Sequence, residues 1–153
     1  MTTPALLLRL SPHIRRVITL IEHWLTPLFD LGIRLYIANI FLPAGLLKLR
    51  DWGSTLALFQ YEYHVPLLPP ALAAVLGTGG ELVFPVLLVF GLAARFSAAA
   101  LWVINIIAVI AYPDISDFGK QDHLLWGLLL LVTMLHGPGR FSCDAWLSKR
   151  WVG

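Results

Sequence analysis

One acidic residue, Glu81, lies inside an otherwise apolar run of residues 71–92, and this run limits the folds that are open to the chain. The run is long enough for a helix to cross a bilayer. A carboxylate near the middle of a membrane is costly unless it has a partner or carries a proton. Gly77, Gly79 and Gly80 precede it, and such small residues let another helix approach closely. The stretch therefore predicts a membrane helix bundle with a polar centre.

The composition favours an integral membrane protein over a soluble one. Of the 153 residues, 58% are hydrophobic and 13% are charged, whereas soluble domains carry about 25% charged residues. The net charge of +2 is too small to indicate a nucleic-acid partner. The single cysteine, Cys143, excludes an internal disulfide and a cysteine-based metal cluster. We therefore expect one domain whose main partner is the lipid bilayer.

Four spanning helices account for most of the chain in this interpretation, with a short interfacial helix at about 54–63 between the first two. Apolar composition and helical spacing place the spans at about 28–47, from the prolines at 66–70 to 92, at 96–112, and from 118 or 123 to 136. The expected fold is an all-α, integral membrane four-helix bundle with an N-terminal amphipathic surface helix.

The chain divides into three predicted parts. Residues 1–26 form an amphipathic segment with basic residues near its start, which we expect on the cytoplasmic membrane surface; packing against the bundle is the alternative. Residues 27–139 form the four-span domain, and residues 140–153 form a polar cytoplasmic tail. Four spans place both termini on one side, which carries most of the arginines, so the positive-inside rule puts the termini in the cytoplasm.

An inner polar cluster is predicted from Arg34, Glu81 and Asn105. Glu81 and Asn105 are each twelve residues from the turn at Ala93, so both lie roughly 18 Å from it at the helical rise. Asn105 is thus a candidate hydrogen-bond partner for Glu81, and the long side chain of Arg34 is expected to reach the same carboxylate. An ion pair that locks the helices together is one reading; a proton-accepting carboxylate or part of a small-molecule pocket is the other.

A second cluster is predicted at the outer mouth of the bundle, from Lys48, Trp52, His64, His123 and Trp126. It is interpreted as an ordinary membrane–water interface or as a pocket for a quinone head group, in which His and Lys contact ring oxygens beside aromatic walls. Two histidines with nearby carboxylates are also ligand types that bind transition metals, so a metal site is a further interpretation. No ligand pair has a recognisable metal-site spacing, so no metal ligands are assigned.

The order of several motifs resembles that of DoxX-type membrane proteins over about residues 31–147. The motifs are Arg34 with Phe41, Gly45 and Lys48; Gly77 to Glu81 with Pro85, Gly91 and Arg95; and His123 with Trp126, Gly137-Pro138-Gly139, Ser142 and Asp144. The resemblance implies a multi-pass protein of the bacterial inner membrane. Members of that family have been linked to quinone-coupled thiosulfate oxidation and to membrane complexes that resist oxidative stress. Residues 61–70 resemble the corresponding loop of a DoxX-type subgroup that accompanies biosynthesis of copper-binding peptides.

The leading hypothesis is therefore an accessory component of a redox or metal-stress system, a subunit rather than a stand-alone enzyme. Quinone is the first cofactor candidate and copper ranks after it. The expected partners are membrane or periplasmic redox or metal-handling proteins, with a second copy of the chain as a further option. The alternatives are a non-catalytic assembly or scaffold protein and a small proton-coupled transporter that uses Glu81.

Overall fold

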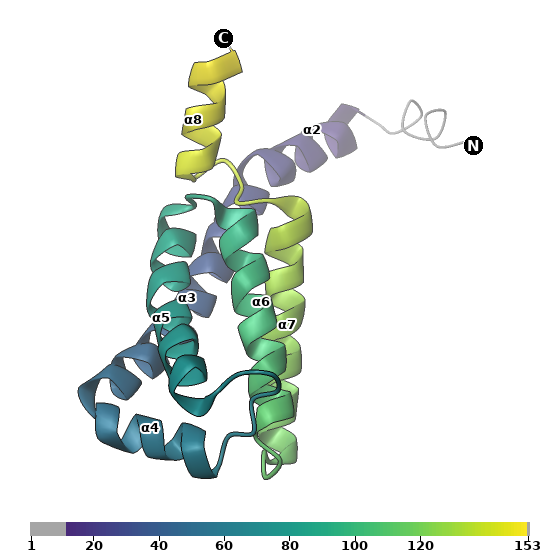
Figure 1. Ribbon diagram of the computed structural model, residues 1–153. Coiled ribbons are helices and arrows are strands. Elements are labelled where there is room, and N and C mark those ends of the chain that lie inside the picture. Colours follow the sequence, from purple (N-terminus) through teal and green to yellow (C-terminus); the bar gives the residue numbers. More distant parts are fainter. Residues whose placement is uncertain (1–11, 153) are drawn as a thin grey trace.

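The computed structural model describes residues 12–152, and within that range the secondary structure is helical and contains no strand (Figure 1). The helices are α2 (Pro12–Leu20), the π-helical η1 (Ile21–Leu25), α3 (Thr26–Arg50), α4 (Trp52–Tyr61), α5 (Pro70–Phe90), α6 (Ala94–Ala111), α7 (Asp117–His136) and α8 (Cys143–Val152). The prediction of an all-α membrane bundle is confirmed.

The four long helices form a closed ring of neighbours. Helix α3 packs against α5 and α7, and α6 packs against the same two helices. Each contributes one large, fully buried aliphatic side chain to a common core, namely Ile37, Leu88, Leu101 and Leu130. The core of the bundle therefore lies on its axis, and the exposed leucines and valines of the same helices point outward.

Three helical stretches in the described part of the chain are long and apolar enough to cross a membrane: Ile14–Arg50, which includes α3, and helices α5 and α6. Helix α7 has 20 residues but carries Asp117, Lys120 and Asp122 in its first two turns. It begins after Ser116, whose hydroxyl accepts a hydrogen bond from the backbone N–H of Gly119 at 3.1 Å. That α7 also crosses the membrane stays a prediction.

Helices α2 and α8 lie at one end of the bundle, and α4 crosses the other end (Figure 1). The side chains described for residues 12–25 are exposed, and α2 runs through η1 into α3 without a break. The first eleven residues of the predicted segment 1–26 lie outside the described residues, and its place on a membrane surface remains a prediction. The tail is helical from Cys143, where the sequence indicated only a polar segment.

Helix α4 begins at a side-chain cap. Asp51 accepts hydrogen bonds from the backbone N–H and the hydroxyl of Ser54, at 3.0 and 2.6 Å, and these bonds lower the pKa of the Asp51 carboxyl. Thr55, in the first turn, donates its hydroxyl to the carbonyl of Lys48 at 2.8 Å. The end of α3 and the start of α4 are thereby held together at the mouth of the bundle.

Candidate functional site

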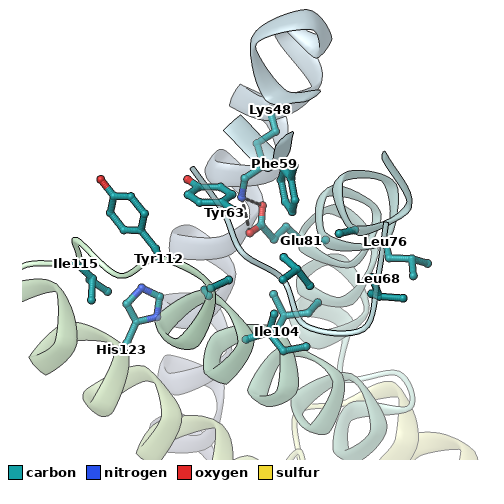
Figure 2. A pocket seen from close by; sticks show the side chains of 16 residues that line it. Lys48, Phe59, Tyr63, Leu68, Leu76, Glu81, Ile104, Tyr112, Ile115 and His123 are labelled. Atoms are coloured by element: carbon teal, nitrogen blue, oxygen red, sulfur yellow. Dashed lines mark hydrogen bonds and ion pairs between the residues drawn. The ribbon is translucent and has the colours of Figure 1, made fainter. Parts of the chain in front are cut away.

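A cavity of about 300 Å³ lies at the α4 end of the bundle, bounded by the end of α3, α4, residues 62–69, α5, α6, residues 112–116 and the start of α7 (Figure 2). We call it the α4-end pocket. Most of its walls are apolar, and the polar side chains on them are few. The lining residues are Lys48, Phe59, Tyr63, Val65, Leu68, Ala73, Leu76, Gly77, Glu81, Ile104, Ile107, Ala108, Ala111, Tyr112, Ile115 and His123.

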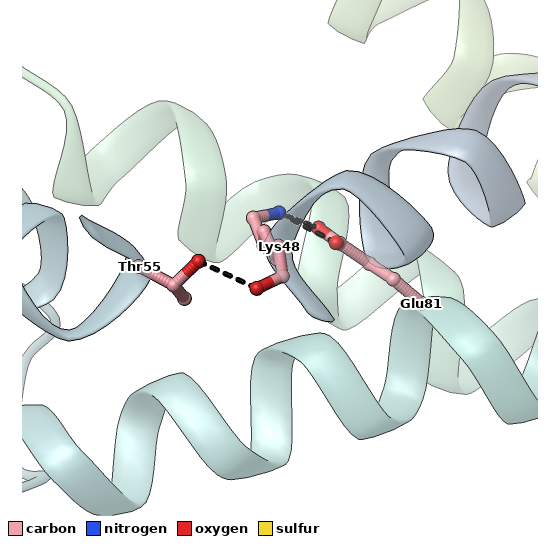
Figure 3. A network of polar contacts seen from close by, with 3 residues as sticks. All are labelled: Lys48, Thr55 and Glu81. Carbon is pink, nitrogen blue, oxygen red and sulfur yellow. Dashed lines mark hydrogen bonds and ion pairs between the residues drawn. The ribbon is translucent and has the colours of Figure 1, made fainter. Parts of the chain in front are cut away.

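The charged wall of the pocket is a single ion pair. Lys48 Nζ donates to Glu81 Oε1 and Oε2 at 2.6 and 2.5 Å, and the two side chains are 19% and 10% exposed (Figure 3). The pair forms because α3 and α5 approach closely at Gly45, where an added Cβ would lie 3.0 Å from Glu81 Cβ. The predicted pairing of Arg34 with Glu81 is therefore wrong, and Lys48 is the partner.

Arg34 is fully buried at the other end of the bundle. Its guanidinium donates to the carbonyls of Leu88 and Val89, each at 3.3 Å, and to the carbonyl of Phe141. The last carbonyls of a helix have no partner within that helix. Arg34 supplies donors to two of them at the end of α5, and the backbone N–H groups of Gly91 and Leu92 donate to the Leu88 and Leu87 carbonyls. In the same region, Asp144 accepts from the backbone N–H groups of Ala93 and Ala94, at 2.8 and 2.9 Å, and caps α6. Arg34 thus stabilises the end of the bundle that is remote from the pocket, and it does not line the pocket.

Another wall of the pocket carries His123, which Asn105 holds at two points. Asn105 Nδ2 donates to the His123 backbone carbonyl at 2.8 Å, and His123 Nδ1 lies 2.7 Å from Asn105 Oδ1. A carbonyl only accepts, so it fixes which end of the amide is NH₂, and Oδ1 must face Nδ1. Nδ1 therefore carries the proton, and Nε2 of the neutral ring is an acceptor. Asn105 was predicted beside Glu81; it instead positions His123.

Three aromatic rings form part of the pocket wall between the polar groups. Phe59 and Tyr63 meet edge to face with ring centroids 5.1 Å apart, and Tyr63 and Tyr112 meet in the same way at 5.5 Å. Burial is the main cause that raises the pKa of the Tyr63 phenol, with the charges of Tyr112, Glu62 and Glu81 adding to it. At neutral pH, Tyr63 is therefore a neutral hydroxyl that can donate a hydrogen bond.

The five residues predicted for the outer mouth separate into two groups. Lys48 and His123 line the pocket, together with Glu81 from the predicted inner cluster. Trp52 packs outside it, against the small core of Phe59 and α5 alanines. His64 and Trp126 do not line the pocket either.

His64 is exposed, and its backbone N–H donates to the carbonyl of Ala111 at 2.8 Å. Trp126 packs edge to face on His123 and on Phe41, with centroids 4.7 and 6.1 Å apart. Trp126 thus packs against the His123 ring and does not line the pocket. The sequence interpretation missed Phe59 and Tyr112. The four-residue spacing of Phe59 and Tyr63 places both on one face of the helix expected at 54–63, and this signal could have indicated Phe59.

Within residues 12–152, no group of three or more His, Cys, Asp or Glu side chains is arranged to hold a metal ion. The polar groups of the pocket are instead one cation paired with one anion, one imidazole and two phenols. Such a set can bind the oxygens of a small ring by hydrogen bonds while the apolar walls hold the ring itself.

Comparison with known proteins gives a family match. The family model described as DoxX matches residues 29–113, which is more than half of the chain. A Haemophilus influenzae protein described only as uncharacterized is 27% identical over 124 residues, which cover 76% of this chain and 82% of the relative. No solved structure matches the chain.

Proposed function

Because the chain belongs to the DoxX family of membrane proteins, we propose that it is an accessory component of a membrane redox or metal-stress system and binds a quinone-type ring in the α4-end pocket. One observation carries the proposal: an apolar cavity of about 300 Å³ has the Lys48–Glu81 pair on one wall and the clamped His123 on another. This combination of apolar walls and a few fixed polar groups is typical of small-molecule sites.

The polar groups suit both oxidation states of such a ring. A quinone presents two carbonyl oxygens at opposite ends of a flat ring, and its reduced form presents two hydroxyls there. Lys48 and Tyr63 supply donors for a carbonyl, and Nε2 of His123 supplies an acceptor for a hydroxyl. The aromatic and aliphatic walls provide the flat apolar contact that the ring requires.

A binding titration on the protein in lipid nanodiscs tests this proposal. The probe is a quinone with a short tail, and the variant is His123→Phe, which keeps a flat ring but removes both nitrogens. Loss of one hydrogen bond should weaken binding by about fivefold to tenfold. His64→Phe is the matched control, because His64 lies at the same end but does not line the pocket. Equal affinity in all three proteins, or no binding to the unmodified protein, would refute quinone binding at this site.

Proton-coupled transport through Glu81 is the second candidate, because Glu81 lines the pocket and is the acid of a largely buried ion pair. As a proton site, Glu81 would have to release Lys48 each time it is protonated. Proton flux in vesicles that depends on an added substrate and disappears in Glu81→Gln would support this function. A stable complex with a partner protein and no bound quinone would instead favour a scaffold role.

The proposed setting is the bacterial inner membrane, crossed by α3, α5, α6 and α7, with both chain ends in the cytoplasm. The supporting features are the basic residues near the α2 and α8 end and the acidic residues 114–122 near the other end. Cys143 is exposed, so a membrane-impermeant thiol reagent should label it only after intact cells are opened. Asp114→Cys in a Cys143→Ser background should be labelled in intact cells, and the reverse pattern would overturn the orientation.

A further inference from the structure

A second cavity lies on the outer surface of the α6–α7 pair. It is a groove of about 380 Å³ with mostly apolar walls, among them Ile106 and Val109 from α6 and Leu124 and Leu128 from α7. The two leucines are 65% and 53% exposed. In a membrane-embedded bundle, this surface is in contact with lipid tails. We call it the α6–α7 groove.

His123 lines both this groove and the α4-end pocket. Helix α6 presents Ile104, Ile107 and Ala108 to the pocket but Ile106 and Val109 to the groove. The two cavities therefore lie on opposite sides of the contact at which His123 meets Asn105. One imidazole, held at Nδ1 by a single side-chain hydrogen bond, is part of the wall between them. Rotation of that ring requires no movement of the helix backbone.

The size of the pocket limits what it can hold. Its volume of about 300 Å³ is at the lower end of the range for sites that enclose drug-sized ligands. A ring fits such a space, whereas a ring with a long hydrocarbon tail must leave most of the tail outside. The α6–α7 groove begins at a residue of the pocket and opens toward lipid, where an apolar tail is already dissolved.

We propose that the natural ligand is a long-tailed, membrane-dissolved amphiphile whose head occupies the α4-end pocket and whose tail lies in the α6–α7 groove, passing beside His123. This inference rests on the proposed function, since it uses the same pocket. It adds a route: the ligand enters sideways from the bilayer between α6 and α7. It also gives His123 a second role as the residue that the tail must pass.

Two probes and two pairs of variants test the route in nanodiscs. The probes are a tail-less quinone and a long-tailed quinone with the same ring. Val109→Phe and Leu128→Phe narrow the groove from α6 and from α7. Their controls are Val103→Phe and Leu135→Phe, which make the same changes on the same helices at exposed positions that line neither cavity.

The groove variants should weaken binding of the long-tailed probe by at least about tenfold, which corresponds to about 1.4 kcal/mol, and should leave the tail-less probe unaffected. The controls should change neither affinity. The route is wrong if the groove variants bind the long-tailed probe normally, or if they weaken both probes alike. Binding of only the tail-less probe to the unmodified protein would also reject the route while the proposed function stands. Binding of neither probe would reject both.

Discussion

Lys48 and Glu81 join α3 to α5 through an ion pair in which one ammonium contacts both carboxylate oxygens, at 2.6 and 2.5 Å. The pair sits at the edge of an apolar cavity, and both side chains are mostly shielded from solvent. It therefore links the packing of the two helices to the chemistry of the pocket.

The first prediction concerns the strength of this pair. Removing one partner leaves a charge that is buried without compensation, which costs about 3–5 kcal/mol in fully buried pairs. Because Lys48 is partly exposed, we expect about 3 kcal/mol for Lys48→Met or Glu81→Gln, measured by unfolding in mixed micelles. The double variant should lose much less than the sum of the two single losses.

The pair of Lys120 and Asp117 provides a control for that cycle, because both of its side chains are well exposed, at 53% and 91%. Exposed pairs contribute little, so the same double-variant cycle there should give almost no coupling. Additive losses for Lys48 and Glu81 would show that the two residues act independently.

The second prediction concerns Gly91, which ends α5 at φ +64°. An added Cβ there would overlap Arg34 Nη1 and the Cβ of Ser142. A left-handed conformation costs a non-glycine residue about 1–2 kcal/mol, and displacement of Arg34 adds to that cost. We expect Gly91→Ala to lower the free energy of unfolding by about 2 kcal/mol or more.

Gly79→Ala is the matched control for this substitution, because Gly79 is helical and has nothing within 4 Å of an added Cβ. Alanine is preferred to glycine in a helix by roughly 0.5–1 kcal/mol, so Gly79→Ala should be neutral or stabilising. Equal effects at the two positions would contradict the described packing around Arg34.

The third prediction concerns alkaline pH. The pKa of Tyr63 is raised above its ordinary value of 10.0, chiefly by burial. The folded protein thus retains this proton at a pH where the unfolded chain begins to lose it. The resulting stabilisation is complete below pH 10 and disappears as the pH rises through the folded-state pKa.

Ultraviolet titration of phenolate formation tests this shift. Tyr63→Phe should remove a component that titrates late in the folded protein and should make stability less dependent on alkaline pH. Tyr61→Phe is the control, because Tyr61 is 73% exposed, and it should leave the late component in place. A late component that survives in Tyr63→Phe would assign the shift to another tyrosine.

The sequence predicted the helices well, because apolar composition and helical spacing determine them directly. Helix α6 was expected at 96–112 and runs from Ala94 to Ala111. Helix α4 was expected at 54–63 and runs from Trp52 to Tyr61, because Asp51 provides an earlier cap.

Side-chain partners were harder to predict, because rise along a helix gives depth but not rotation. Glu81 and Asn105 are equally far from the turn at Ala93, yet the contact between α5 and α6 falls at Gly80 and Ile104. Asn105, one residue further on, faces α7 and bonds to His123. The sequence contains the residues of this contact but not the angle at which α6 packs.

The error over Arg34 has a different cause. A buried charge leads one to look for an opposite charge, but guanidinium donors also bond to carbonyls. Both terminal nitrogens of Arg34 do so, whereas its buried Nε has no hydrogen-bond partner. The end of α5 supplies such carbonyls at Leu88 and Val89. Lys48 lies fourteen residues further along α3, roughly 21 Å at the helical rise, and it is the residue at the depth of Glu81.

Photoaffinity labelling with a quinone that carries its reactive group on the ring tests the central claim most directly. After labelling in native membranes, peptide mapping should place the modification on residues that line the α4-end pocket, such as Tyr63, Ile107 or Tyr112. An excess of unmodified quinone should prevent this labelling. Labels spread over lipid-facing residues such as Val83 and Phe96, and unaffected by the competitor, would contradict the proposed quinone site.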